Sequence, residues 1–363
     1  DPLFNIHLNV DYPFNLTGIL YFPKITNDIN LQKDKIQLYQ NQVFVTDNVE
    51  GIVPEFLTLL RGVIDSPDIP LNVSRSYLQV DSAVKKITNY ITRKVADKLN
   101  SLFKEDRKKF EEKWNDIKVI IEYGMLSEDK FFEKSNAFAL FPTTDNKFYT
   151  YDELIKKIKK NHKDKDGKTI ILYSSNTQEQ DSYIKEANKK GYTVLLLDSP
   201  IVSHLIQKLE TSKEKISFAR VDSDAIDKLI KKDEKSISKL TEKEQQELKE
   251  HIEEVIPKEK YTVQLEAMDS ESLPFMITQP EFMRRMKDMQ NTGGNSMFGN
   301  MPEMYNLIIN TNNKLVGEIF KTKTKNKRER LIKQSLDLAK LSQNLLKGED
   351  LTEFIKRSYD LIK

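Results

Sequence analysis

The feature that most constrains the fold of this chain is a strand–helix–strand pattern between residues 167 and 200. The apolar runs TIILY (169–173) and TVLLL (193–197) are typical of buried strands, and a helical segment at 178–190 lies between them. Gly191 occupies the position expected for a helix C-cap. When one helix connects two strands, the strands usually pair in a parallel arrangement. This segment therefore predicts a small α/β subdomain.

Short apolar runs and amphipathic helices also alternate in the first third of the chain. Strands are predicted at 17–22, 36–39 and 43–45, and a helix is predicted near 53–64. A long helix follows Ser74. Its apolar residues recur every three or four positions and form one stripe: Val84, Ile87, Ile91, Val95, Leu99 and Leu102. A helix that backs a sheet in this way predicts a layered α/β domain.

The middle of the chain is predicted to be mainly helical. One helix, which Gly124 is predicted to end, has an apolar face formed by Phe103, Phe110, Trp114, Ile117 and Ile121. The Lys- and Glu-rich stretch 227–260 predicts solvated amphipathic helices. Strands are predicted beyond it at 261–265, 275–278 and 305–310, and two C-terminal helices flank Gly348.

Together these elements predict a fold of the α/β (α+β) class in four parts. The parts are a layered large α/β subdomain at 1–105, a helical connector at 106–160, a small α/β subdomain at 161–220, and an α+β C-terminal domain at 221–363 that ends in a helix pair.

The composition excludes several classes of protein. The 363 residues include 58 Lys or Arg and 56 Asp or Glu, and the formal net charge of +2 argues against a dedicated nucleic-acid binder. The chain has no cysteine, which excludes disulfides and Cys-ligated metals and fits a reducing compartment such as the cytoplasm. No membrane span or signal peptide is predicted. The opening Asp-Pro indicates a processed or truncated chain.

The common enzyme signatures are missing from the sequence. It contains no glycine-rich dinucleotide motif, no phosphate-binding P-loop and no HExxH zinc motif. The four histidines are far apart, and we interpret them as surface or packing residues: His7, His162, His204 and His251. No metal site is therefore predicted.

The segment DSPDIPLNVSRSYLQ (65–79) is the first candidate site. Arg75 falls in the first turn of the predicted helix, and Gln79, four residues later, leaves on the same face. A guanidinium beside a helix N-terminus suits a phosphate group, because both offer positive charge and donors. The pattern also fits a local ion pair between Arg75 and a nearby aspartate.

A concentration of methionines is the second candidate site. Eight of the nine methionines lie between residues 268 and 304. The candidate binding residues lie in a predicted helix and in the glycine-containing loop that follows it. They are Phe282, Met283, Met286, Met289, Met297, Phe298 and Met301. Flexible methionines suit an apolar surface that binds varied partners, although an ordinary core helix would show the same spacing.

The stretch from Gln37 to Gln79 closely resembles the middle domain of the heat-shock protein 90 family, whose bacterial members are of the HtpG type. The matching pieces are LYQNQVFVTD, VPEFL and RGVIDSPDIPLNVSRSYLQ. The opening PLFNIHLNVDYPFNLTGILYFP resembles the start of that domain, and GYTVLLLDSPI and the closing helices occupy the expected places. The resemblance extends over nearly the whole chain and is strongest in residues 1–105.

This resemblance implies the middle and C-terminal domains of an ATP-dependent molecular chaperone. ATP and Mg would be bound by the family's N-terminal domain, which this sequence does not match, so we expect no cofactor and no ATPase activity in this chain alone. In the family, a middle-domain arginine reaches the ATP γ-phosphate and stabilises charge in the transition state. Arg75 matches that arginine, and Gln79 matches its partner.

The resemblance also implies two kinds of protein partner. The family's C-terminal helices form a four-helix bundle between the protomers of a homodimer, which assigns a dimerisation role to Leu331, Leu338, Leu341, Leu345, Leu351, Phe354, Ile355 and Ile362. The Met-rich segment, residues 282–290, resembles the family's amphipathic helix for unfolded or partly folded client proteins. A non-catalytic dimeric interaction scaffold and an unrelated hydrolase stay open as alternatives.

Overall fold

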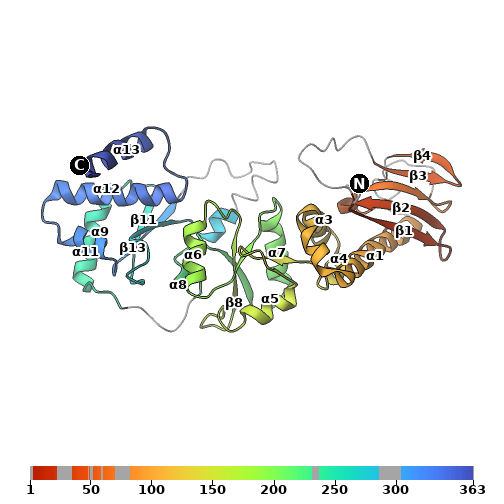
Figure 1. Cartoon of the computed structure of the whole chain (residues 1–363), viewed down its shortest axis with the longest axis horizontal. Coiled ribbons are helices and arrows are strands. Elements are labelled where there is room, and N and C mark those ends of the chain that lie inside the picture. The colour runs from red at the N-terminus through yellow and green to blue at the C-terminus, as the bar shows by residue number, and fades with distance from the viewer. Residues whose placement is uncertain are drawn as a thin grey trace. The chain divides into compact units, whose positions relative to one another are not determined.

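Figure 1 shows the computed structural model of the chain, which describes residues 3–22, 35–47, 49, 52–58, 60–69, 82–230, 237–285 and 304–362. The chain divides into two compact units. The first contains residues 1–141 and 148–154, and the second contains residues 142–147 and 155–363. The predicted large α/β subdomain falls in the first unit, whereas the predicted small α/β and C-terminal parts share the second.

A mixed five-stranded sheet forms the centre of the first unit. Its strands lie in the order β1-β2-β5-β3-β4; β3 pairs with β5 in parallel, and the other pairs are antiparallel. The strands are β1 (Phe4–Val10), β2 (Leu16–Phe22), β3 (Ile36–Gln40), β4 (Val43–Thr46) and β5 (Arg61–Asp65). The three strands predicted in this region are confirmed.

The helix predicted near 53–64 is wrong. The described residues of this stretch form a short 3-10 turn, η1 (Glu55–Leu57), and then enter β5. Gly62 of β5 has a φ of +142°, and a Cβ there would lie 2.0 Å from the carbonyl oxygen of Ile19 on β2. Glycine permits this close approach of β2 and β5, a tertiary constraint that hydrophobic periodicity does not register.

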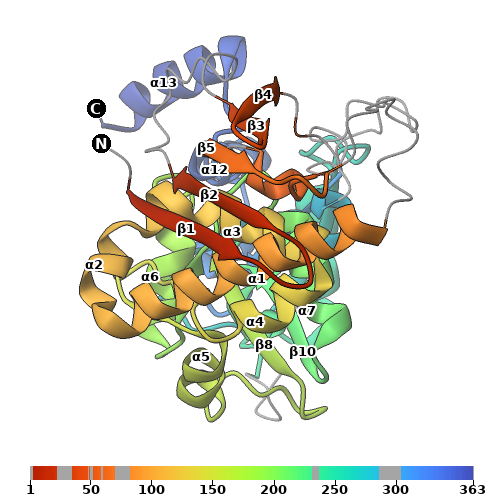
Figure 2. The same ribbon diagram turned by 90° about the vertical axis from the view of Figure 1, so that its right-hand side faces the viewer.

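Helix α1 (Ser82–Glu105) covers one face of this sheet, as Figure 2 shows. The predicted stripe is buried at Val84, Ile87, Ile91, Val95 and Leu99. The hydroxyl of Tyr90 donates to the carbonyl of Asn9 on β1 at 3.1 Å, which ties the helix to the sheet. The predicted layered α/β arrangement is therefore present in this unit.

The aromatic face predicted for one helix is divided among several helices. After α1 come α2 (Arg107–Glu112), α3 (Trp114–Ser127) and α4 (Asp129–Ser135). Gly124 does not end a helix as predicted but lies inside α3, where a Cβ would approach the rings of Phe56 and Phe131 to 2.8 Å. Close packing against aromatic rings, rather than a C-cap, explains this glycine.

The chain passes between the units within two short elements. These are the hairpin of β6 (Phe141–Pro142) with β7 (Phe148–Tyr149), and helix α5 (Tyr151–Ile158). In the first unit, Arg107 pairs with Glu153 of α5 through two hydrogen bonds of 2.6 and 2.8 Å. These bonds lower the pKa of Glu153 to about 2.

The strand–helix–strand prediction is confirmed in the second unit. Strands β8 and β9 pair in parallel, and Gly191 follows the intervening helix with a φ of +76°. A third strand, β10, which the sequence analysis did not predict, pairs in parallel with β8. The elements of this α/β layer are β8 (Thr169–Ser174), α6 (Asp181–Lys189), β9 (Val194–Leu196), α7 (Val202–Ser212) and β10 (Ile216–Arg220).

His162 is a packing residue of this layer. Its ring is 1% exposed and lies edge-on against Tyr192. Nδ1 is 2.7 Å from the carbonyl oxygen of Ile170, and Nε2 accepts the backbone N–H of Thr193 at 3.0 Å. A neutral ring with its proton on Nδ1 satisfies both bonds, so this histidine joins the starts of β8 and β9.

A second sheet lies in the C-terminal part of the same unit. Its order is β11-β13-β12, with β11 parallel and β12 antiparallel to β13. The three strands confirm the predictions: β11 (Tyr261–Glu266), β12 (Phe275–Thr278) and β13 (Tyr305–Asn310). The helices of this part are α8 (Ile226–Leu229), α9 (Glu242–Glu253), α11 (Lys314–Lys321), α12 (Lys325–Ser342) and α13 (Gly348–Ile362).

The α/β layer and the second sheet share one hydrophobic core. Met268, Met276 and Ile308 from around the second sheet cluster with Leu172 of β8 and Tyr183 of α6. The hydroxyl of Tyr183 also donates to the backbone of β12, 3.0 Å from the carbonyl oxygen of Ile277. This continuous core explains why the two parts form one compact unit.

Candidate functional site

The described residues contain part of the predicted sites. Arg75 and Gln79 lie outside them, as do five of the predicted client-binding residues: Met286, Met289, Met297, Phe298 and Met301. Phe282 and Met283 are described and lie in a helical segment at 281–285. The predicted dimerisation residues lie on α12, on α13 and in the turn between them.

The segment 281–285 buries charged side chains and exposes its largest apolar one. Phe282 is 70% exposed, whereas Arg284 is 3% exposed. Glu281 and Arg285 are also largely buried. Because soluble proteins normally bury Phe and expose Arg, this inversion requires partners for the buried charges. It also leaves an apolar side chain available to a binding partner.

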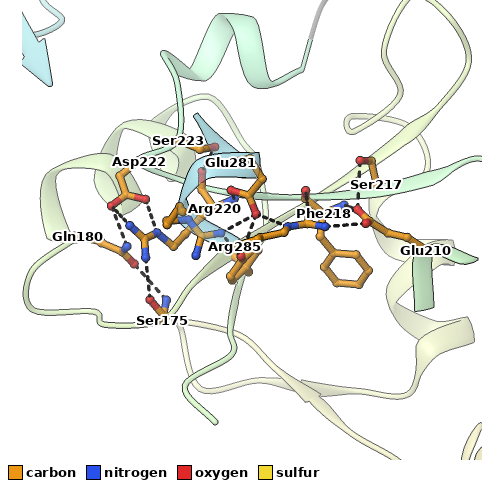
Figure 3. A network of polar contacts seen from close by, with 12 residues as sticks. Ser175, Gln180, Glu210, Ser217, Phe218, Arg220, Asp222, Ser223, Glu281 and Arg285 are labelled. Atoms are coloured by element: carbon orange, nitrogen blue, oxygen red, sulfur yellow. Dashed lines mark hydrogen bonds and ion pairs between the residues drawn. The ribbon is translucent and has the colours of Figure 1, made fainter. Parts of the chain in front are cut away.

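Glu281 is the centre of the charged network drawn in Figure 3. Its Oε1 accepts hydrogen bonds from the Tyr173 hydroxyl at 3.0 Å, from Arg284 at 2.5 Å and from Arg285 at 2.8 Å. Its Oε2 accepts the backbone N–H of Arg220 at 3.3 Å. Four donors therefore satisfy the two oxygens of one buried carboxylate.

Arg285 connects Glu281 to α7 and β10, as Figure 3 shows. Its guanidinium donates to both oxygens of Glu210, at 2.7 and 3.2 Å, and to the carbonyl of Phe218 at 2.8 Å. Glu210 in turn accepts the backbone N–H of Phe218 at 2.6 Å. This two-pronged pairing fixes both the distance and the orientation of the arginine.

Arg284 is held by an aromatic side chain of the central strand. Its guanidinium lies over the ring of Tyr173, 5.5 Å from the ring centre, and also hydrogen-bonds the Tyr173 hydroxyl. Tyr173 belongs to β8 and is fully buried. The contact therefore combines a cation–π interaction with a hydrogen bond in a desolvated place.

The network continues from Arg220 toward α6. The Arg220 side chain pairs with Asp222 through bonds of 2.5 and 2.9 Å. Asp222 also accepts a bond from Gln180 at 2.9 Å, and Gln180 accepts the hydroxyl of Ser174 and the N–H of Ser175 at the end of β8. The loops after β8 and β10 are thus joined to the segment 281–285.

The electrostatics of this network keep each group in the protonation state that its hydrogen bonds require. Burial alone would raise the pKa of Glu281, but attraction and hydrogen bonds from Arg284 and Arg285 outweigh it and lower the pKa to about 2. Burial raises the pKa of Tyr173, which therefore stays protonated as a donor. Burial opposes the charge of Arg285, but Glu210 and Glu281 more than compensate and raise its pKa.

A small polar cavity of about 150 Å³ adjoins the network at the carboxyl ends of β8 and β10. Its polar lining includes Ser175, Gln180, Arg220, Asp222 and Thr278. Asp222 already neutralises the one guanidinium of this lining, so the cavity offers no unpaired cation. Within the described ranges, no group of three metal-ligating side chains occurs, and no helix is long and apolar enough to cross a membrane.

The C-terminal helix pair forms the other predicted site. Leu331 and Leu345 pack against the core of the second sheet, and Phe354 is buried within the chain. Leu338, Leu341 and Ile355 instead have about half of their surface exposed, at 51%, 47% and 45%. Leu351 is half-buried; the side chain of Ile362 is outside the described residues.

Polar contacts join the two helices. Arg357 of α13 pairs with Asp337 of α12, and Gln334 donates to Ser358 at 2.9 Å. Lys340 of α12 lies 3.5 Å from Asp350 of α13. An open groove of about 450 Å³ beside the helices is lined by Thr324, Asn326, Lys327, Arg330, Leu331, Gln334 and Arg357. The pair is thus held together and keeps apolar side chains on its surface.

Comparison with known protein families identifies the family of this chain. The family described as "Hsp90 protein" matches residues 1–363, the whole chain. The chain belongs to the heat-shock protein 90 family. The resemblance seen in residues 37–79 is therefore confirmed, and it extends to the second unit.

Several relatives of this Hsp90-family chain are bacterial proteins named chaperone protein HtpG. The HtpG of Bacteroides thetaiotaomicron is 47% identical over 430 aligned positions, which cover the whole chain and 63% of the relative. The HtpG of Porphyromonas gingivalis is 52% identical over 323 positions, which cover 88% of the chain and 47% of the relative. An endoplasmin homolog of Arabidopsis thaliana is 28% identical over 64% of the chain. The chain thus spans less than two thirds of the HtpG relatives it matches.

The buried network of the Hsp90-family chain was not predicted from its sequence. The helical spacing placed Phe282 on an apolar face, but it did not indicate that Arg284 and Glu281 would be buried. Tyr173 and Glu210 are more than 70 positions away from this segment. The only local signal is Glu281 followed by arginines at i+3 and i+4, a spacing that is also common on solvated helices.

The depressed pKa of Glu281 predicts a specific loss of stability in acid. The folded chain keeps this carboxylate ionised down to about pH 2, whereas the unfolded chain protonates it near 4.5. Its contribution is therefore complete above about pH 4.5 and is lost as the pH falls toward 2, by on the order of 3 kcal/mol. Urea unfolding should show a large stability difference between the parent and Glu281→Gln near pH 6.

The same comparison in acid provides the control. The difference between the parent and Glu281→Gln should shrink markedly at about pH 3, because the unfolded parent is then mostly protonated at this position and the low pKa of the folded carboxylate no longer contributes its full stabilisation. Glu271→Gln, an exposed carboxylate of the same unit, should leave the pH profile unchanged. A stability difference that stayed constant from pH 6 to 3 would contradict the depressed pKa.

Proposed function

We propose that this chain is the client-binding and dimer-forming part of an ATP-dependent chaperone of the HtpG type. The observation that carries the proposal is the inverted burial at 281–285. In this Hsp90-family chain, Phe282 is exposed on a segment whose charged side chains are buried and paired. Such an exposed aromatic side chain on a rigid base suits unfolded or partly folded proteins, which present apolar side chains.

The proposed client surface begins at Phe282 and Met283 and extends over the methionines that follow in sequence. Methionine side chains are flexible and polarizable, so one surface can contact many apolar sequences. The described part of the segment supports this role because Phe282 is exposed while Arg284, two positions later, is buried in the charged network.

Replacing the exposed aromatic residue tests the client surface. Phe282→Ser should weaken binding of reduced, carboxymethylated α-lactalbumin about five- to thirtyfold, because a central aromatic contact typically contributes about 1–2 kcal/mol to an interface. Fluorescence anisotropy of the labelled client measures the dissociation constant. Leu273→Ser removes another exposed apolar side chain of the same unit and should have little effect. Equal losses in both variants would argue against a defined client surface.

The second proposed role is formation of a homodimer through α12 and α13. Leu338, Leu341 and Ile355 are exposed on a helix pair whose opposite side packs into the core through residues such as Ile332 and Leu336. A second copy of the same pair would cover these side chains and complete a four-helix bundle. The domain division predicted from the sequence assigns this role to residues 221–363.

Replacing the exposed leucines by charged residues should dissociate the proposed dimer. The double variant Leu338→Glu/Leu341→Glu should raise the dissociation constant about a hundredfold or more, since each change occurs twice in a symmetric interface and removes buried apolar area. Light scattering over a dilution series measures the dimer fraction. Lys333→Glu, on an exposed position of the same helix, serves as the control. A monomeric parent chain at micromolar concentration would refute the dimer.

The third proposed role concerns ATP turnover in the longer protein. ATP and Mg would be held by an N-terminal domain of the family, and Arg75 would reach the γ-phosphate with Gln79 beside it. Arg75→Ala, in the chain joined to a family ATP-binding domain, should lower turnover by about 10³-fold or more and leave nucleotide affinity nearly unchanged. Coupled ATPase assays and calorimetric ATP titration separate the two effects. Unchanged hydrolysis would favour a passive interaction scaffold.

A further inference from the structure

The start of the Met-rich segment is attached to one layer of the fold at three places. Tyr173 is on β8, Glu210 is on α7 and the N–H of Arg220 is at the end of β10. Tyr173 and the N–H of Arg220 hydrogen-bond Glu281, and Glu210 accepts from Arg285. Because the first turn of a helix is unfavourable to form, tertiary contacts of this kind decide where such a segment begins and how it points.

The spacing of the anchored residues determines which side of the segment faces solvent. Residues 281, 284 and 285 are related by three and four positions, so their side chains share one helix face. When this face is fixed on the α/β layer, residue 282 lies outside the anchored face. Phe282 is accordingly 70% exposed. The charged face and the exposed aromatic residue are therefore two consequences of one arrangement.

We propose that Glu281, Arg285 and Glu210 form a clamp that positions the client-binding segment on the α/β layer. This inference rests on the proposed client role of Phe282 and the methionines after it. The three residues are positioning residues, because they act on the segment and do not themselves contact the client. The clamp fixes the direction in which the segment leaves the layer.

Ion pairs suit this positioning role better than apolar contacts. The clamp brings together two carboxylates and, with Arg284, two guanidinium groups, so its charge is balanced. A guanidinium that donates to both oxygens of Glu210 is held in one orientation, whereas apolar surfaces can shift relative to each other. Removing one member would leave a buried charge without its partner, which destabilises strongly.

The test therefore replaces both members of one pair. The double variant Glu210→Met/Arg285→Met removes the clamp with apolar side chains of similar length, a type of change that is often neutral for stability. The control is Lys228→Met/Glu266→Met, which removes another ion pair of the second unit, at 2.6 Å, away from the segment. Thermal unfolding establishes that both double variants are folded.

Two measurements follow on these folded proteins. Because the chain has no cysteine, Gln207→Cys on α7 and Phe282→Cys give two unique positions for spin labels. Double electron–electron resonance then reports the distribution of distances between α7 and the segment. In unlabelled proteins, anisotropy with reduced, carboxymethylated α-lactalbumin reports client affinity.

We expect a narrow distance distribution in the parent and the control, and a broad one in the clamp variant. Client affinity of the clamp variant should fall about tenfold, as expected if the competent orientation drops to about a tenth of the population. If the distances remain narrow, the clamp is wrong whatever the client result. If they broaden but affinity is unchanged, while Phe282→Ser weakens binding, the positioning role is wrong.

The proposed function fails in a different way. If Phe282→Ser leaves client affinity unchanged, the client surface is misassigned, and the role of positioning it is overturned with it. The distance measurement does not depend on a client. It therefore still shows whether the clamp itself fixes the segment to the α/β layer.

Discussion

The second unit depends on a carboxylate that is kept charged in a place largely shielded from water. Glu281 keeps its charge because four donors converge on it, and these come from the strand β8, from the end of β10 and from its own helical turn. All four donors lose this shared acceptor if the carboxylate moves. The arrangement therefore allows one geometry for the start of the Met-rich segment and resists intermediate ones.

The two surfaces proposed to bind proteins both combine exposed apolar side chains with neighbouring ion pairs. At 281–285, Phe282 is exposed above Glu281 and Arg284. On the C-terminal helix pair, Leu338 and Leu341 are exposed beside the ion pairs of Asp337 and Lys340. In each case polar contacts hold the backbone, while apolar side chains face outward. A surface that is already ordered loses less conformational entropy when a partner binds.

The shared core supports the segment 281–285 from the side of the second sheet. Met268, Met276 and Ile308 of the C-terminal part pack with Leu172 and Tyr183 of the α/β layer. The segment 281–285 directly follows β12 and is anchored to β8, α7 and β10. A displacement of the α/β layer would consequently be transmitted to the segment through both apolar packing and ion pairs.

The sequence by itself determined the local elements and the family. Long apolar runs gave most strands correctly, the stripe of α1 was visible because helical periodicity repeats many times, and the motifs of residues 37–79 indicated the heat-shock protein 90 family. Tertiary structure alone decided that residues 61–65 form a strand, because Gly62 is required by its close contact with Ile19 on another strand. It likewise decided that Arg284 is buried while Phe282 is exposed. Burial of a charge depends on partners such as Tyr173 and Glu210, which are distant in sequence and approach only when the α/β layer has folded.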